Sequence, residues 1–214
     1  MGKLINGPQG QVIGSVGNNI SYILNGQNVL KMKRTKEIKF EDLSFLQKVN
    51  CQRMAVTANF LNSIQPLLKA GYGQKAHGTR LNYHNLATSY HKLHALKGEY
   101  PSIEIDYLKV QISTGDLPMP LVNTAIPDAA GIIINWTYNV EDSTVSGFDQ
   151  TMILLHYPEF EESISFFYGI ERRIKTQLVE LPDPYRTSRA EVYLSFVSAD
   201  RTLVATSKYL GRLN

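Results

Sequence analysis

The sequence contains very little cysteine and no long hydrophobic run. Cys51 is the only cysteine among 214 residues, so an intramolecular disulfide is excluded, and a lone thiol favours a reducing compartment. No stretch approaches the roughly eighteen continuous apolar residues that a membrane span requires. Glycine and proline interrupt residues 1–17, where a signal peptide would need an apolar segment. These absences predict a soluble, cytoplasmic protein that has no contact with a membrane.

Common catalytic motifs are also missing. The sequence lacks G-x-S-x-G, H-E-x-x-H and both glycine-rich phosphate-binding patterns. Its carboxylate pairs, such as Glu104 with Asp106, have no distinctive pattern, and acidic runs between strands are usually solvated. We therefore expect no catalytic residue, no metal site and no cofactor, and an enzyme is the weakest of the function classes.

Acidic residues are scarce in the first half of the chain. Residues 1–100 contain 13 Lys and Arg against 4 Asp and Glu, a balance of +9, whereas residues 101–214 contain 9 against 15, a balance of −6. Opposite charges on two halves indicate either an anionic partner for the basic half or a head-to-tail contact between copies of the chain. The alternative is that each half simply has its own solvated surface.

A β-hairpin is predicted around Asn25-Gly26, because a type I′ turn needs positive φ at both central residues. Such a loop pairs Leu24 with Gln27, and this register leaves apolar side chains on both faces of the hairpin. An antiparallel hairpin on the outside of a domain normally has one polar face, so we expect a partner to cover the second face. The predicted assembly interface comprises Ile20, Tyr22, Ile23, Leu24, Val29, Leu30 and Met32.

Two helices are expected after the hairpin. Apolar residues recur at helical spacing between 40 and 69, which predicts an amphipathic helix that Pro66 kinks near its end. The Gly71-Tyr72-Gly73 segment is expected to stop this helix. A second helix is expected over 80–96, followed by Gly98 as a stop signal.

Four histidines lie close together in this region: His77, His84, His91 and His94. Helical spacing places His84 and His91 on one face of the second helix and His94 a little to one side. This face lies opposite Leu86, Tyr90 and Leu93, which we expect to face the core. A metal site would need three or four converging ligands, and the only thiol is remote in sequence. We interpret the histidines as surface or interface residues, with metal binding as the alternative.

Short apolar segments of strand length, separated by turn residues, follow Pro101. The predicted strands are 103–113, 131–138, 150–157, 163–168, 176–181, 190–198 and 202–210. Their even spacing predicts an antiparallel β-sandwich of the immunoglobulin or fibronectin type, with Trp136 as a core anchor. The expected fold class is α+β: a basic domain at 1–115 with the β-hairpin and two helices, then an acidic β-sandwich domain at 116–214.

Basic residues interleaved with tyrosines suggest a second function class. Binding to single-stranded nucleic acid uses cations to neutralise phosphates and aromatic rings to stack on bases. The candidate anion-binding residues are Lys31, Lys33, Arg34, Lys75 and Arg80. No known nucleic-acid-binding signature is present, however, and tyrosines at helical spacing are more often core or interface residues.

Longer motifs are distributed along nearly the whole chain. They are MGKLINGPQGQVIGSVGN at the start, NYHNLATSY at 82–90, IEIDYLKVQIST at 103–114, FVSAD at 196–200 and SKYLG at 207–211. Through these motifs the chain resembles a family of proteins of unknown function from Bacteroidota. The resemblance implies a short N-terminal β and helical module joined to an immunoglobulin-like or fibronectin-like domain, and it supplies no catalytic residues.

The function expected from the sequence is that of a structural or interaction protein that acts without catalysis. It would form a homo-oligomer or bind a protein partner, because the hairpin has two apolar faces and the halves have opposite charge. The alternative is a nucleic-acid-binding module that uses the basic N-terminal half. A sandwich domain that binds a carbohydrate or another small ligand is the third possibility.

Overall fold

The computed structural model describes residues 3–4, 12–24, 26–34, 39–79, 81–141 and 144–213. The chain divides into two compact units, 1–48 and 49–214, and each is described by itself. The domain boundary expected between 115 and 116 falls inside the second unit. An independent domain at 116–214 therefore stays a prediction.

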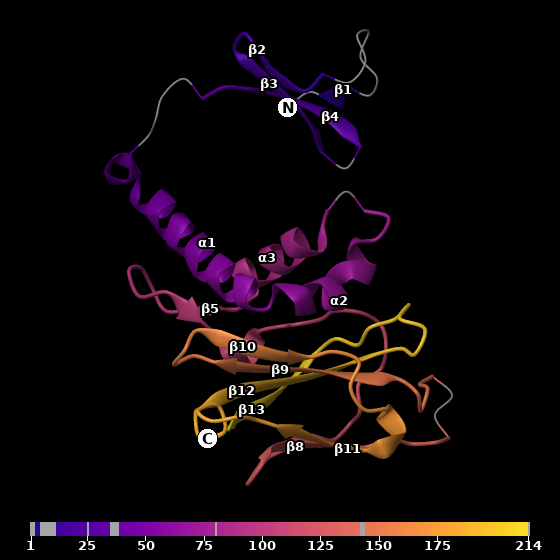
Figure 1. Cartoon of the computed structure of the whole chain (residues 1–214). Helices are drawn as coiled ribbons and strands as arrows, with labels where there is room; N and C mark the ends of the chain where they lie inside the picture. The colour runs from indigo at the N-terminus through magenta and orange to yellow at the C-terminus, as the bar shows by residue number, and fades with distance from the viewer. Residues whose placement is uncertain are drawn as a thin grey trace. The chain divides into compact units, whose positions relative to one another are not determined.

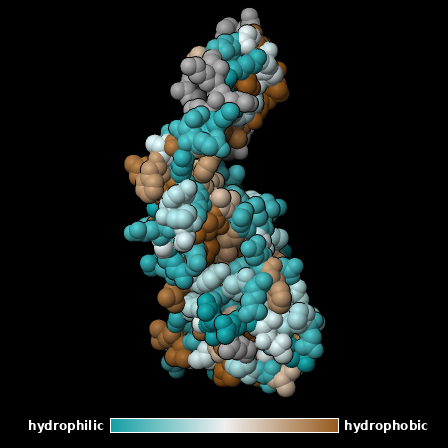
Figure 2. Space-filling view, turned by 90° about the vertical axis from the view of Figure 1, so that its left-hand side faces the viewer, coloured by the Kyte–Doolittle hydropathy of each residue, from teal (hydrophilic) through white to brown (hydrophobic). Residues whose placement is uncertain are grey.

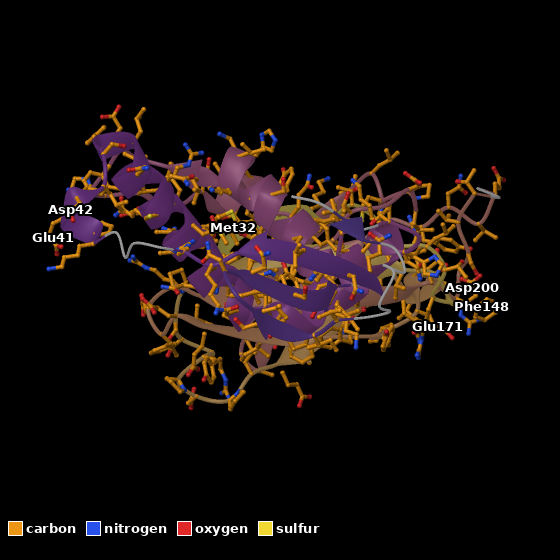
Figure 3. All side chains as sticks on the ribbon, turned by 90° about the horizontal axis from the view of Figure 1, so that it is seen from above. Met32, Glu41, Asp42, Phe148, Glu171 and Asp200 are labelled. Atoms are coloured by element: carbon orange, nitrogen blue, oxygen red, sulfur yellow. The ribbon has the colours of Figure 1, made fainter. Side chains whose placement is uncertain are left out.

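The first unit contains a four-stranded antiparallel sheet. Its strands are β1 (Lys3–Leu4), β2 (Gly14–Val16), β3 (Asn19–Leu24) and β4 (Gln27–Met32), in the order β1-β4-β3-β2. The predicted hairpin register is confirmed, because Leu24 pairs with Gln27 and Tyr22 with Val29. Gly26 has the expected positive φ of 73°, and Asn25 lies outside the described residues. A 3-10 helix, η1 (Phe40–Asp42), follows, with Glu41 and Asp42 exposed to solvent (Figure 3).

Three α-helices lie among the described residues: α1 (Phe45–Ser63), α2 (Gln65–Ala76) and α3 (Tyr83–His94). The expected single helix is interrupted at Ile64, and Pro66 lies in the first turn of α2, where its missing N–H costs no intrahelical hydrogen bond. The expected stop at residues 71–73 is wrong, because α2 continues to Ala76. α3 begins after Asn82, whose side chain accepts a 2.7 Å hydrogen bond from the Asn85 amide.

The second unit contains two larger antiparallel sheets and a short ribbon. The strands are β5 (Leu96–Lys97), β6 (Glu104–Ile105), β7 (Asn123–Asp128), β8 (Gly131–Trp136), β9 (Gln150–Tyr157), β10 (Glu162–Phe166), β11 (Thr176–Glu180), β12 (Ala190–Val197) and β13 (Lys208–Leu213). The sheet orders are β10-β9-β12-β13, β11-β8-β7 and β5-β6. The chain is thus a mixed α+β protein with antiparallel sheets.

Two predicted strands are wrong over most of their length. Of 103–113, only β6 is a strand, and the 3-10 helix η2 (Tyr107–Lys109) follows it. The backbone there finds other partners, since the Ile112 amide donates to Ser207 Oγ at 2.9 Å. Of 202–210, regular pairing begins only at Lys208. A further strand, β7, was not predicted because it contains Pro127; it lies at a sheet edge, where proline is tolerated.

The central strands β9 and β12 of the sheet β10-β9-β12-β13 are buried on both faces. Along β9, Met152 and Leu154 pack in a core with the helices, whereas Ile153 and Leu155 pack in a second core with strands β8 and β11. The helices therefore lie on one side of this sheet and the β11-β8-β7 sheet on the other (Figure 1). Trp136 is 4% exposed in the second core, which confirms it as a core residue. Within the part of the chain that is described, no helix has both the length and the apolarity that a membrane span requires.

Candidate functional site

The N-terminal sheet exposes large apolar side chains on both of its faces. The register places Val16, Ile23, Leu30 and Met32 on one side, which we call the Met32 face. Met32 is 68% exposed and Val16 is 65% exposed. The opposite side, which we call the Tyr22 face, carries Ile20, Tyr22, Leu24 and Val29.

The Tyr22 face is the better covered of the two. Val29 is 6% exposed, and Ile20 and Tyr22 are half-buried, whereas Leu24 at the end of the strand is 55% exposed. Lys31 lies on the same face, with its Nζ 5.4 Å from the centroid of the Tyr22 ring. This face therefore combines a cation–π contact with an exposed leucine.

The predicted anion-binding residues are only partly brought together. Lys31, Lys33 and Arg34 form an exposed run at the end of β4. Lys75 belongs to the second unit, where its Nζ lies 3.4 Å from Thr114 Oγ1. Arg80 lies outside the described residues, so the structure groups three of the five candidates.

The predicted orientation of the α3 histidines is wrong for His91. This side chain is fully buried, its Nδ1 lies 2.8 Å from the Ala87 carbonyl oxygen, and its Nε2 accepts a 3.4 Å hydrogen bond from the Gln111 amide. Burial lowers the pKa of His91 to about 4. Leu93, expected in the core, is 67% exposed. The helix turns its Ala87 side to the core, because the small alanine allows close packing.

The other histidines of this group are more accessible. His77 and His94 are exposed, and the His94 ring lies 5.1 Å from that of Tyr90. His84 is half-buried, with a 3.3 Å hydrogen bond between its Nδ1 and Thr88 Oγ1. Among the described residues, no group of three or more His, Cys, Asp and Glu side chains converges as metal ligands would.

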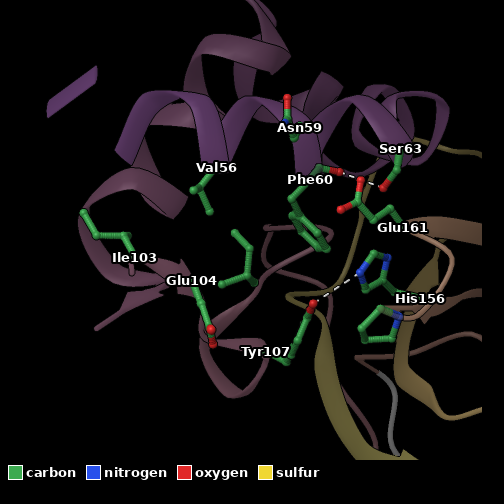
Figure 4. A pocket seen from close by; sticks show the side chains of 11 residues that line it. Val56, Asn59, Phe60, Ser63, Ile103, Glu104, Tyr107, His156 and Glu161 are labelled. Atoms are coloured by element: carbon green, nitrogen blue, oxygen red, sulfur yellow. Dashed lines mark hydrogen bonds between the residues drawn. The ribbon is translucent and has the colours of Figure 1, made fainter. Parts of the chain in front are cut away.

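A cavity of about 450 Å³ lies beside the fifth histidine, His156, and was not predicted from the sequence. Its walls come from α1, β6, η2 and the turn between β9 and β10 (Figure 4). Phe60 and Tyr107 contribute aromatic rings to this His156 cavity, and Glu104 and Glu161 contribute carboxylates. In the sequence, the one sign of this cavity is a histidine near the end of the apolar run that forms β9.

A chain of hydrogen bonds passes along the His156 cavity. His156 Nδ1 lies 2.9 Å from Ser163 Oγ, and Ser163 Oγ lies 3.1 Å from Ser63 Oγ. The second ring nitrogen, Nε2, lies 3.4 Å from the Tyr107 hydroxyl (Figure 4). Burial lowers the pKa of His156 to about 4, although the Glu191 carboxylate opposes this shift. The imidazole is therefore neutral at pH 7. No Lys or Arg of the described part of the chain lines the cavity.

Two further buried charged groups have structural partners. Arg172 is 3% exposed; its Nη2 donates to the Pro118 carbonyl at 2.7 Å, and its Nη1 lies 3.5 Å from the Asp149 carboxylate. Glu191 accepts hydrogen bonds from Arg212 Nε at 2.7 Å and from the Tyr209 hydroxyl at 2.5 Å. These groups link strands and loops within the second unit.

Comparison with known proteins yields one family. A model described as a family of unknown function (DUF6266) matches residues 4–211. No curated protein and no solved structure matches the chain.

Proposed function

The chain belongs to DUF6266, a family of unknown function, and from this premise we propose that it is an interaction protein. It assembles with further copies of itself through its N-terminal sheet and performs no catalysis. The observation that carries this proposal is the exposure of apolar side chains on both faces of that sheet. Hydrophobic surface on the N-terminal unit is visible in Figure 2.

The Met32 face supports the proposal most directly. Met32, Val16 and Ile23 are 68%, 65% and 37% exposed on neighbouring strands of one small sheet. Single exposed apolar residues are ordinary on protein surfaces, whereas several side by side mark an interaction surface. Covering this face with a partner removes apolar area from water, which favours association.

The charge distribution supports a second copy of the chain as the partner. Residues 1–100 have a balance of +9 and residues 101–214 a balance of −6. The exposed residues Lys31, Lys33 and Arg34 lie at the end of β4, the strand that contributes Met32 to the Met32 face. A basic surface on one copy is complementary to an acidic surface on another, and such a head-to-tail contact produces rings or filaments.

We further infer that the β10-β9-β12-β13 and β11-β8-β7 sheets form an immunoglobulin-like sandwich. Both sheets are antiparallel and contribute side chains to one shared core. Within it, the rings of Trp136 and Phe196 lie 5.5 Å apart in an edge-on arrangement. The exposed thiol of Cys51 supports a cytoplasmic location, because reducing compartments preserve free thiols.

Light scattering coupled to size-exclusion chromatography tests the assembly proposal. The wild-type mass is expected to rise with protein concentration at low salt, whereas Met32→Lys and Leu24→Lys remain monomeric. Both positions are exposed, so the folded state tolerates lysine there. Leu121→Lys is the matched control, because Leu121 is 90% exposed in the second unit. A strictly monomeric wild-type protein, or variants that associate as the wild type does, would contradict the proposal.

Nucleic-acid binding through Lys31, Lys33 and Arg34 is the second candidate. These three side chains are exposed in one run, and phosphate neutralisation by such a run releases counterions. A gel-shift titration with a single-stranded oligonucleotide at two salt concentrations tests it. Binding that weakens steeply with salt and is lost in a variant with all three changed to Ala supports this candidate, and no binding at low salt removes it.

A further inference from the structure

One face of α2 borders a second cavity, of about 440 Å³, in the second unit. Residues of this face lie three, four, seven and eight positions apart, as helical periodicity requires: Pro66, Lys69, Ala70, Gly73 and Gln74. Phe167 and Tyr168, which follow β10, and Arg201 in the turn after β12 form the facing wall. We call this space the Tyr168 cavity. Its volume lies in the range of roughly 300–1,000 Å³ found for ligand sites.

The Tyr168 cavity is positively charged. Lys69 and Arg201 line it and are exposed, and no Asp or Glu among the described residues lines it. The carboxylate nearest to Arg201 in sequence is that of Asp200, which is exposed to solvent (Figure 3). It accepts hydrogen bonds from Ser198 Oγ at 2.6 Å and from Thr202 Oγ1 at 2.8 Å. The two cations are therefore available to an anionic ligand.

An aromatic surface lies beside these cations. Tyr168 is 39% exposed, and Arg201 Cζ lies 4.0 Å from the centroid of its ring. Both residues have left-handed backbones, with φ of 51° for Tyr168 and 61° for Arg201. Such conformations are uncommon for residues other than glycine, and they concentrate at ligand sites. The Gln74 side chain fixes the arrangement by donating a 2.7 Å hydrogen bond to the Arg201 carbonyl.

Gly73 lies in the wall of this cavity and leaves its space open. Glycine inside a helix is unfavourable relative to alanine, so its presence usually has a packing reason. Gly71 has one, because a Cβ there would lie 2.3 Å from the Ile112 carbonyl oxygen. At Gly73 a Cβ would meet no described atom within 4 Å. Packing among the described residues therefore does not require this glycine, and a larger side chain at this position would extend into the cavity.

We propose that the Tyr168 cavity binds a nucleotide, either free or as part of a single strand. The phosphate contacts Lys69 and Arg201, and the base stacks on the face of the Tyr168 ring that Arg201 does not cover. Phe167 and the open position at Gly73 bound the space for the base. This site lies within the second unit and rests neither on the N-terminal sheet nor on its basic run.

Fluorescence anisotropy with a fluorescein-labelled twelve-residue oligothymidylate tests the proposal on the full chain. Wild-type protein is expected to bind at 20 mM NaCl and to bind more weakly at 200 mM. Lys69→Ala and Arg201→Ala each weaken binding, and the double variant lowers the slope of log K against log salt concentration by about 0.7, the value for one phosphate of a single strand. Tyr168→Ala weakens binding roughly tenfold or more, because base stacking is lost. Arg189→Ala, which removes an exposed cation outside the cavity, leaves binding unchanged.

Gly73→Leu is the sharpest variant, because it fills the cavity without removing any charge. It is expected to abolish binding while circular dichroism and the melting temperature show an intact fold. Competition with unlabelled compounds then distinguishes a free nucleotide from a single strand as the ligand. Displacement of the probe by AMP indicates a site for free nucleotides, whereas displacement only by unlabelled oligothymidylate indicates a site for single strands.

Three outcomes would overturn the proposal. The first is no binding of the probe at 20 mM NaCl. The second is equal binding by wild type, Tyr168→Ala and Gly73→Leu, since attraction by charge alone would then explain the result. The third is displacement by ribose 5-phosphate as efficient as by AMP, because the base would then make no contribution. None of these outcomes bears on assembly through the N-terminal sheet.

Discussion

At the scale of single residues, two buried imidazoles couple stability to pH. Burial lowers the pKa of His91 and of His156 from 6.5 to about 4 in the folded protein. Protonation therefore favours the unfolded chain, and the stability from each neutral histidine is present above pH 6.5 and is lost as the pH falls toward 4. For each histidine, this difference in pKa between the unfolded and folded states corresponds to about 3 kcal/mol in the free energy of unfolding.

Urea denaturation between pH 7 and pH 4 checks this prediction. The free energy of unfolding is expected to fall steadily over that interval, and His156→Gln should remove about half of the fall. Asp149 acts in the opposite direction, since burial raises the pKa of its carboxyl. A free energy of unfolding that does not change between pH 6.5 and pH 4 would contradict the assignment.

The places of some single residues were predictable from the sequence, and those of others were not, for a physical reason. Trp136 was predicted because an isolated tryptophan in an apolar strand has few places other than a core. His91 was misplaced because its partner, the Gln111 amide, lies twenty positions away. A polar side chain becomes compatible with a core only through such a contact, and helical periodicity carries no information about it.

At the scale of elements, α2 offers a matched pair of substitutions. Gly71→Ala forces a Cβ to within 2.3 Å of the Ile112 carbonyl oxygen, and it is expected to destabilise the protein by about 1–3 kcal/mol, as overpacking does. Gly73→Ala meets open space and is expected to stabilise the helix by about 0.5–1 kcal/mol. Thermal and urea unfolding of the two variants should shift in opposite directions.

Periodicity predicted the elements that pack regularly and failed where the backbone finds irregular partners. The predicted strand 150–157 coincides with β9, and 190–198 differs from β12 by one residue. In 103–113, by contrast, Ile105, Val110 and Ile112 are buried in the core with the helices, although most of the segment is not a strand. Apolar alternation shows which side chains are buried but not whether the backbone pairs with another strand.

The same limit applies to the candidate sites. The two-faced hairpin was predictable, because its register follows from a two-residue turn. The His156 and Tyr168 cavities were not, because each is bounded by segments far apart in the chain, such as α2 and the turn at Arg201. Only the packing of helices on a sheet brings those segments together.

At the scale of the whole molecule, the opposite charges of the two halves predict that the proposed assembly is sensitive to salt. Residues 1–100 have a net charge of +9, and in the proposed contact they attract residues 101–214 of another copy, whose net charge is −6. Raising the ionic strength from 0.02 to 0.3 M should weaken this association, because the Debye length shortens. Sedimentation velocity at several salt concentrations measures this effect. Association that strengthens with salt would indicate a contact dominated by apolar surface.

The central strands β9 and β12 of the second unit, which are buried on both faces, have a consequence for how this protein can change during evolution. Strands β9 and β12 supply side chains both to the core that they share with the helices and to the core that they share with β8 and β11. A recombination event that transferred the strands without the helices would leave Met152, Leu154 and Tyr193 uncovered. We therefore expect the helices and strands to be inherited together, and insertions to be tolerated in loops rather than where the helices pack on the sheet.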